Sequence, residues 1–403
     1  MRKSWGERAD VAVVGGGVAG LAAARELRRR GLSVAVLDDG RAGAASRAAA
    51  GMLAPQAEAD APDELFELLS ASRDLYTDFA AAVREESGLA FEIEKTGTLY
   101  LALNEQDEEE VERRFAWQSR AGLAVERLTA REARSLEPNV SPAVRMALRF
   151  PRDWQVESRR LVSALEAAAV ALGVRLIRGV EARGVELAGG RAAGVVTSEG
   201  TLGAGAVLFA AGAWNSRLSK FDGGEFGNSL NQYLHDDPHV EAVRGQILCY
   251  RQADARAPLF RHVVYGPRGY LVPRGGGLLL AGSTSEPGAY DPRVTEEGVR
   301  SIGARAAEMA PAVASLELAD SWAGLRPRAR DGRPVLGESV DVPGLFYAAG
   351  FYRNGILLTP AAGETVADLV TGRATRIPAR VLEAFSPARF QQTPLTSQVL
   401  APR

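Results

Sequence analysis

The spacing of apolar and polar residues near the start of the chain changes between two periods. Asp10 to Val14 is a short apolar run of the length of a buried strand, Leu21 to Arg30 has apolar residues at helical spacing, and Ser33 to Asp38 is again an apolar run. Glycines in Gly15 to Gly20 separate the first run from the helix. This pattern predicts a strand, helix and strand that form one βαβ unit.

Further along the chain, helical spacing and capping residues predict more helices. Asn104 is a suitable N-cap, since its side-chain oxygen can accept hydrogen bonds from the first turn of a helix. The predicted helices cover Asp63 to Glu86, Asn104 to Gln118, Glu157 to Leu172, Thr295 to Met309 and Leu357 to Val370.

Strand signals lie between these helices. Gly189 and Gly190 separate two apolar stretches and indicate a hairpin, and Pro and Gly break residues 247–281 into several short strands. Residues 221–240 are rich in Gly, Asn and Asp and have no periodicity, so we expect a long surface loop or a mobile lid. Thr98 to Leu103 alternates like an antiparallel strand. The other predicted strands are Met146 to Phe150, Val180 to Leu187, Arg191 to Ser198, Ala204 to Phe209 and Leu345 to Ala349.

Composition narrows the class of protein. With 46% hydrophobic and 24% charged residues, a chain of 403 residues is typical of a globular protein with two domains. The net charge of -2 does not indicate binding to nucleic acid or to an anionic membrane surface. A small neutral or zwitterionic substrate fits this balance well.

The few sulfur and imidazole groups give little capacity for metal binding. Cys249 is the only cysteine, which excludes an internal disulfide and suits a reducing cytoplasm. We expect His235, His239 and His262 to be surface or loop residues and no metal to be bound. Basic residues before the first apolar run resemble the start of a signal peptide. Three consecutive glycines instead favour a strand that enters a turn. We therefore expect a cytoplasmic protein.

Gly15, Gly17 and Gly20 form the pattern G-x-G-x-x-G between the first strand and its helix. Gly15 permits a tight turn, Gly17 lets the backbone approach a pyrophosphate, and Gly20 lets helix and strand pack closely. Val18 and Ala19 begin the helix, whose free N–H groups attract phosphate. The pattern predicts a dinucleotide site; the alternative is a glycine turn that binds nothing.

Asp38 ends the second strand, 18 residues after Gly20. A carboxylate at this distance can accept hydrogen bonds from the ribose of the adenosine half. The alternative is that Asp38 only caps a turn with Asp39.

Two segments favour FAD over NAD. Arg41 to Pro55 is rich in Ala, Ser and Gly, so its backbone can lie against a flat ring system. Near the other end, Gly350 and residues 351–355 join a strand to a predicted helix whose amides at Gly355, Ile356 and Leu357 point outward. Such a helix start stabilises the negative charge of a reduced flavin, although an ordinary helix cap remains the alternative.

Four segments resemble a known family. They are AAAGMLAP (Ala48 to Pro55), GYLVPR (Gly269 to Arg274), SWAGLRP (Ser321 to Pro327) and FYRNGILLTPAAG (Phe351 to Gly363). In this order they resemble the FAD-dependent D-amino-acid oxidase superfamily and, within it, the glycine oxidases of thiamine biosynthesis. The resemblance covers almost the whole chain.

The resemblance implies a fold and a domain division. It implies an α/β protein with a Rossmann-like FAD-binding domain of the GR2 type and a discontinuous α+β substrate domain on a mostly antiparallel sheet. We expect the FAD-binding domain to comprise residues 1–90, 150–220 and 322–403, and the substrate domain residues 91–149 and 221–321. It also implies a non-covalent cofactor, since relatives with covalent flavin use a cysteine near Arg326, where this chain has none. Family members are often tetramers.

The resemblance also implies roles for individual residues. Arg326 would hold the substrate carboxylate, Tyr270 would lie beside it, and Arg353 would be a second basic group. The expected FAD contacts are Gly15, Gly17, Val18, Ala19, Gly20, Asp38, Ser46, Ala50, Gly51, Met52, Val180, Ala211, Gly212, Gly350, Arg353, Asn354, Gly355, Ile356 and Leu357. Arg268 and Ser285 are expected around the pocket.

The chemistry explains why these residue types are needed. A guanidinium binds a carboxylate through two parallel N–H bonds and thereby fixes its orientation. The substrate carbon then lies over the flavin, so that positioning replaces acid–base groups. Glycine would give glyoxylate, ammonia and hydrogen peroxide, with molecular oxygen as the acceptor.

Each of these residues could also have a purely structural role. Arg326 could be one of several solvated or paired arginines, Tyr270 could only pack, and Arg353 could pair with an acidic neighbour. Two rival functions also stay open: a broader D-amino-acid oxidase or a dehydrogenase that passes electrons to a carrier, and a flavin-holding subunit for assembly or electron relay. Sarcosine and small D-amino acids stay possible substrates.

Overall fold

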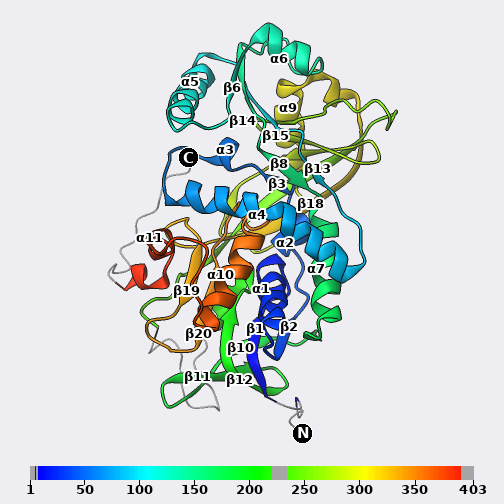
Figure 1. The fold of residues 1–403 in the computed structure, drawn as a ribbon. Helices are drawn as coiled ribbons and strands as arrows, with labels where there is room; N and C mark the ends of the chain where they lie inside the picture. Colours follow the sequence, from blue (N-terminus) through cyan, green and yellow to red (C-terminus); the bar gives the residue numbers. More distant parts are fainter. Residues whose placement is uncertain (1–4, 6–7, 220–233, 392–403) are drawn as a thin grey trace.

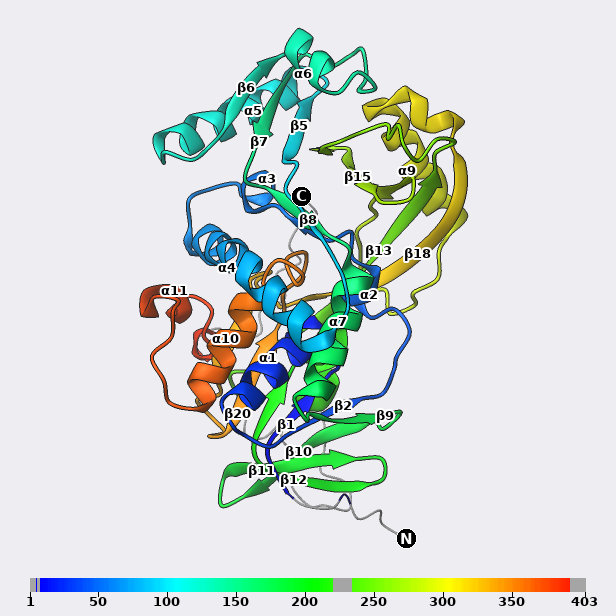
Figure 2. The same cartoon turned by 45° about the vertical axis from the view of Figure 1, so that its right-hand side comes forward.

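The computed structural model describes residues 5, 8–219 and 234–391 of the chain. Figures 1 and 2 show two lobes, each built on one large sheet. Within the described residues, no helix combines the length and apolar character that crossing a membrane requires.

The lower lobe in Figure 1 contains an eight-stranded sheet whose centre is parallel. Strand β1 (Ala9–Val14) lies between β2 (Val34–Asp38) and β12 (Gly200–Phe209), and all three run parallel. Strands buried on both faces read as continuous apolar runs, as these do. The remaining strands are β9 (Arg175–Arg178), β10 (Ala182–Ala188), β11 (Arg191–Thr197), β19 (Val335–Glu338) and β20 (Leu345–Ala349).

Four helices cover one face of this sheet and form its main core. They are α1 (Val18–Arg29), α4 (Glu64–Ser87), α7 (Ser158–Ala171) and α10 (Thr359–Val370). Helices α1 and α10 approach so closely that a Cβ added to Gly363 would lie only 2.9 Å from Ala22. The alanine-rich sequence of α1 therefore serves close packing.

The upper lobe contains a nine-stranded sheet that is antiparallel except where β14 pairs with β5. At one edge, the long strand β18 (Glu317–Arg328) pairs along the whole of β13 (Glu241–Arg251). The other strands are β5 (Thr98–Ala102), β6 (Glu126–Thr129), β7 (Met146–Phe150), β14 (Val263–Gly266), β15 (Gly269–Arg274), β16 (Leu278–Gly282) and β17 (Glu286–Pro287).

Each face of the nine-stranded sheet has its own core. Leu271 of β15 packs with α6 (Ala130–Leu136) and α9 (Glu296–Met309), whereas Tyr270 and Val272 point to the opposite face. This alternation turns Tyr270 toward the lower lobe. Helix α5 (Glu105–Arg120) also packs on the sheet.

Short elements connect the lobes. A three-stranded sheet joins β3 (Met52–Leu53), β8 (Trp154–Val156) and β4 (Ile93–Glu94). The short helices are α2 (Ala45–Ala48), α3 (Pro55–Glu58), α8 (Asn215–Ser219) and α11 (Ala379–Glu383), with 3₁₀ turns at Gly212–Trp214, Pro311–Ser315 and Pro387–Phe390.

The α/β class predicted from the sequence is confirmed, and so is the predicted cap at Asn104. Asn104 caps α5 through a bond from the Asp107 amide, and Thr295 caps α9 through a bond from the Gly298 amide. The predicted domain division stays a proposal. Its boundary at residue 322 falls inside β18, which the β13 pairing holds within the upper sheet.

Three local predictions need correction. Helix α10 begins at Thr359 and not at Leu357. Pro360 has no N–H to donate to the Ile356 carbonyl, so a helical bond is missing there. The hydroxyl of Tyr76 donates to that carbonyl instead. Strand β5 is buried on both faces, because the sheet has a core on each side. Most of the predicted 221–240 loop lies outside the described residues, but Leu234 is buried.

Candidate active site

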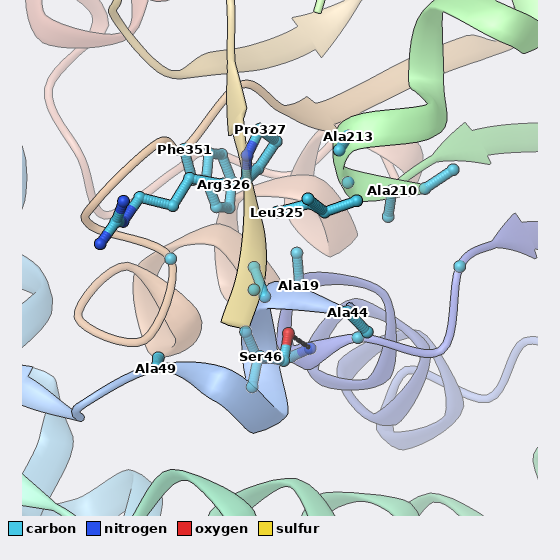
Figure 3. Close-up of a pocket in the computed structure, with 18 of the residues that line it drawn as sticks. Ala19, Ala44, Ser46, Ala49, Ala210, Ala213, Leu325, Arg326, Pro327 and Phe351 are labelled. Carbon is cyan, nitrogen blue, oxygen red and sulfur yellow. Dashed lines mark hydrogen bonds between the residues drawn. The ribbon is translucent and has the colours of Figure 1, made fainter. Parts of the chain in front are cut away.

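A cavity of about 530 Å³ opens between the two sheets. Figure 3 shows Ala19 of α1, Ser46 of α2 and Arg326 of β18 around it. Almost all residues predicted as cofactor contacts line this cavity. They are Gly15, Gly17, Val18, Ala19, Asp38, Ser46, Ala50, Gly51, Met52, Val180, Ala211, Gly212, Gly350, Arg353, Asn354, Gly355, Ile356 and Leu357.

The glycine turn at the start of α1 has the geometry that the sequence predicted. Gly15 has φ +113°, and a Cβ there would lie 2.3 Å from the Ala210 carbonyl oxygen. Gly20 does not line the cavity; a Cβ on it would lie 1.9 Å from the Gly15 carbonyl oxygen, so it serves helix–strand packing. The N-terminus of α1 therefore faces the cavity without side chains in the way.

Ser46 contacts this turn from a different part of the chain. Its Oγ accepts a hydrogen bond of 3.1 Å from the Val18 N–H, drawn as a dashed line in Figure 3. A Cβ on Gly17 would lie 3.0 Å from the same Oγ. The segment after β2 is thus held against the start of α1.

Asp38 lies at the end of β2 and lines the cavity. A Cβ on Gly16 would lie 2.5 Å from its Oδ2, so the absence of a side chain there leaves room for the carboxylate. Its Oδ1 accepts a bond of 3.2 Å from the Gly40 amide. Asp38 therefore closes a turn and still presents a carboxylate to the cavity.

Gly51 shapes the opposite wall. It has φ +77°, and a Cβ would lie 1.9 Å from the Val156 carbonyl oxygen. This left-handed conformation together with the close backbone admits only glycine. Met52 follows and pairs with Gln155 in the small three-stranded sheet.

Arg326 and Tyr270 meet at the upper end of the cavity, and both line it. The guanidinium of Arg326 donates to the Thr284 carbonyl at 3.1 Å and to the Ser283 Oγ at 2.7 Å. Among the described residues, no carboxylate lies within ion-pair distance of it. Burial raises the pKa of the Tyr270 hydroxyl, while the Arg326 charge and Ser283 oppose this rise. Tyr270 is therefore a neutral hydrogen-bond donor beside a cation.

Arg353 has an acidic partner, as the alternative from sequence allowed. Its Nε lies 3.4 Å from the Glu58 carboxylate, and Nη2 donates to the Tyr265 hydroxyl at 2.6 Å. The Glu58 charge raises the pKa of Arg353. Glu58 itself lines the cavity on α3 and was missed from the sequence.

The comparisons with known proteins agree with this geometry. Residues 10–369 match the family described as FAD dependent oxidoreductase. This chain belongs to that family. A glycine oxidase of Geobacillus kaustophilus is 39% identical over 373 residues, which are 91% of this chain and 94% of that protein. A bifunctional protein ThiO/ThiG of Synechocystis is 33% identical over 95% of this chain but 54% of its own length.

A solved structure of glycine oxidase from Geobacillus kaustophilus is also similar. It has a TM-score of 0.86 and 37% identity, and the match covers 95% of this chain and 99% of that one. The resemblance to FAD-dependent amino-acid oxidases that the sequence indicated is confirmed, and the cofactor of this oxidoreductase family is FAD.

The residues present fit FAD. Gly15 and Gly51 let the backbone of two walls pack against neighbouring carbonyl oxygens, with which a Cβ would collide, so these positions add no side chain to the cavity. At the far end, Val180, Ala211 and Gly212 line the cavity, and the Ala211 amide is bonded to Asn215 at 2.7 Å. Thus the glycine turn at the start of α1 and Arg326 line one and the same cavity in this FAD-dependent oxidoreductase.

Several expectations around the site need correction. Arg268 does not line the cavity, because Asp107 binds its guanidinium at 2.5 Å. Ser285 is exposed and reaches the cavity only through Tyr352, whose hydroxyl lies 3.5 Å away. His262 lies in a loop as expected but is buried, with Nδ1 2.7 Å from Glu137.

Sequence reasoning also missed residues that shape the site. Gly245 and Ser283 lie beside the Arg326 guanidinium, and Ile247 and Trp214 line the cavity. The sequence around Gly245 does not indicate its role, because that role depends on the pairing of β13 with β18.

Proposed function

We propose that this enzyme oxidises the carbon–nitrogen bond of glycine or a similarly small amino acid. The observation that carries the proposal is the Arg326 guanidinium, which lines the cavity with a buried tyrosine and without a carboxylate partner among the described residues. Each terminal nitrogen has a second N–H besides the one donated to Thr284 or Ser283. Two parallel N–H bonds from a guanidinium select a carboxylate and fix its orientation.

The charges in the site support a substrate with one carboxylate. Arg353, the second cation of the predicted site, is bonded to Tyr265 and paired with Glu58. Only Arg326 of the two is left without an acidic partner. The Tyr270 hydroxyl, kept protonated by its raised pKa, would donate to the same carboxylate beside Arg326.

The reaction needs orientation more than proton transfer by the protein. FAD, when bound, supplies a two-electron acceptor. Arg326 and Tyr270 hold the carboxylate end, and the free amine of the substrate then promotes loss of hydride from the adjacent carbon. For glycine, oxygen and water, the products are glyoxylate, ammonia and hydrogen peroxide.

A non-covalent cofactor and a biosynthetic role complete the proposal. Cys249, the only cysteine of the sequence, is buried in β13 and does not line the cavity. The ThiO/ThiG name of the Synechocystis relative supports a link to thiamine biosynthesis, where the proposed role is in forming the thiazole. A cytoplasmic location and a homotetramer stay predictions.

The test is peroxide release by the FAD-loaded enzyme with glycine, sarcosine and D-alanine in parallel. We expect turnover of glycine or sarcosine with one peroxide formed for each molecule of oxygen consumed. Bleaching of the flavin by substrate without peroxide in air would favour a dehydrogenase that uses a carrier. No bleaching by any of the three would contradict the proposal and favour the flavin-holding subunit.

A further inference from the structure

Five successive backbone carbonyls in residues 47–51 are each bound by a group outside that segment. The Gly51 carbonyl accepts from the Val156 amide at 2.8 Å. The other donors are side chains: Arg159 to Arg47 at 3.3 Å, Trp322 to Ala48 at 2.9 Å, Ser158 to Ala49 at 2.6 Å and Arg274 to Ala50. These donors come from α7, β8, β15 and β18.

The consequence is a segment with a fixed orientation. Ala48, Ala49, Ala50 and Gly51 line the cavity, while their carbonyls are bound by groups that do not line it. Within the described part of the chain, no partner is recorded for the N–H groups of Ala50 and Gly51. Backbone N–H groups without partners are donors that a polar cofactor edge can satisfy.

Arg274 is the charged member of this set. Its guanidinium also binds the Gln155 side chain and the Val156 carbonyl, the latter at 3.2 Å. Among the described residues, no carboxylate lies within ion-pair distance of it, and the charges of Glu94 and Glu157 act on it only from farther away. Burial lowers the pKa of Arg274 to about 10, so the group is still charged at neutral pH.

Two further observations place this charge close to the cavity wall. A Cβ on Gly51 would lie 3.1 Å from the Arg274 Nη2, so the guanidinium lies directly behind that glycine. Arg274 also lies four residues after Tyr270 on β15, and residues at that spacing share one face of a strand. A charge that is not paired with an acid acts over a longer range in a low-dielectric interior.

We propose that Arg274 is a positioning residue for the flavin, which holds the Ala50 carbonyl away from the cavity and stabilises negative charge on the reduced cofactor through the 48–51 segment. The proposal rests on the FAD chemistry of the proposed function, but not on the identity of the substrate.

The test compares Arg274→Gln, Arg274→Lys and the control Arg28→Gln by FAD affinity and midpoint potential, both measured without substrate. Arg28 is a matched control, because its guanidinium also binds two carbonyls, Leu172 at 3.0 Å and Leu32 at 2.7 Å, and does not line the cavity. For Arg274→Gln we expect the Kd for FAD to rise at least tenfold. We also expect a two-electron midpoint potential lower by at least roughly 30 mV, the equivalent of a tenfold change in the equilibrium constant.

The variant Arg274→Lys distinguishes the positioning of the 48–51 segment from the stabilisation of negative charge. Lysine keeps the charge but lacks the planar fork that reaches several acceptors, so we expect weaker FAD binding with a potential near that of the wild type. Wild-type affinity and potential in Arg274→Gln would overturn the proposal. If that variant does not fold, wild-type affinity in Arg274→Lys would overturn the positioning role. Failure of the substrate panel leaves these measurements intact, since they use no substrate.

Discussion

The Arg326 guanidinium lies over Gly245 of the neighbouring strand. A Cβ on Gly245 would lie 2.1 Å from Nη1 and 2.3 Å from Cζ of Arg326. The residue directly opposite Arg326 is Val243, so the arginine side chain runs diagonally along β13 to the space that glycine leaves. A missing side chain on one strand thus sets the position of the cation on the other.

Gly245→Ala should therefore impair substrate binding and spare the cofactor. The added methyl group collides with the guanidinium, so we expect KM to rise at least roughly tenfold, the equivalent of about 1.4 kcal/mol, with unchanged FAD affinity. Steady-state kinetics and FAD titration measure the two effects. Gly275→Ala is the control, because a Cβ there meets nothing within 4 Å. Equal KM values for both variants would refute the steric argument.

Arg326→Met should remove the carboxylate contact with little change in the flavin spectrum. Two charge-assisted hydrogen bonds at about 1.5–3 kcal/mol each predict a loss in kcat/KM of at least roughly 100-fold. The measurement is kcat/KM for the preferred amino acid. A value within a few-fold of wild type would show that Arg326 does not hold the substrate.

The alkaline side of the pH profile should not depend on Tyr270. Because burial raises the pKa of its hydroxyl above the ordinary value of 10, it stays protonated throughout the range in which the enzyme is assayed. Tyr270→Phe should lower kcat/KM without moving its alkaline limb. A limb that disappears in the variant would mean that Tyr270 itself titrates there.

Asp236 should make stability fall as the pH rises. Burial raises the pKa of this carboxyl from 3.8 to about 6 in the folded protein. The unfolded chain releases the proton first, so the stabilisation present below about pH 4 is lost as the pH rises toward 6. Asp236→Asn keeps an acceptor for the Val340 amide but loses the acceptor for the Ser339 hydroxyl, a loss that does not vary with pH.

The measurement for Asp236 is denaturant unfolding of both proteins at pH 5 and pH 8. Relative to wild type, Asp236→Asn should be more stable at pH 8 than at pH 5 by ~1 kcal/mol. A difference that does not change with pH, or changes with the opposite sign, would contradict the raised pKa.

Gly51 and Gly88 provide a matched pair of left-handed glycines. Both have positive φ, +77° and +67°, but only at Gly51 would a Cβ meet a backbone oxygen. Gly88→Ala should cost ~1–2 kcal/mol of unfolding free energy from backbone strain alone. Gly51→Ala should cost more than about 4 kcal/mol and weaken FAD binding. Thermal unfolding and FAD titration test this, and similar losses in the two variants would refute it.

The sequence alone determined the parts of this protein that depend on local conformation. The glycine turn, the strand–helix–strand unit and the helix cap at Asn104 follow from which backbone angles and side-chain bonds neighbouring residues permit. Motif resemblance supplied Arg326 and Tyr270, and the cavity brings both together.

Only the tertiary structure decided which charges are available for chemistry. Arg326 and Arg353 are alike in sequence, but α3 places Glu58 beside Arg353, whereas the pairing of β13 with β18 places Gly245 beside Arg326. In the same way, the role proposed for Arg274 depends on its bonds to the Ala50 and Val156 carbonyls, which lie far away in the sequence. Such contacts depend on register and packing between remote segments, and no local pattern encodes them.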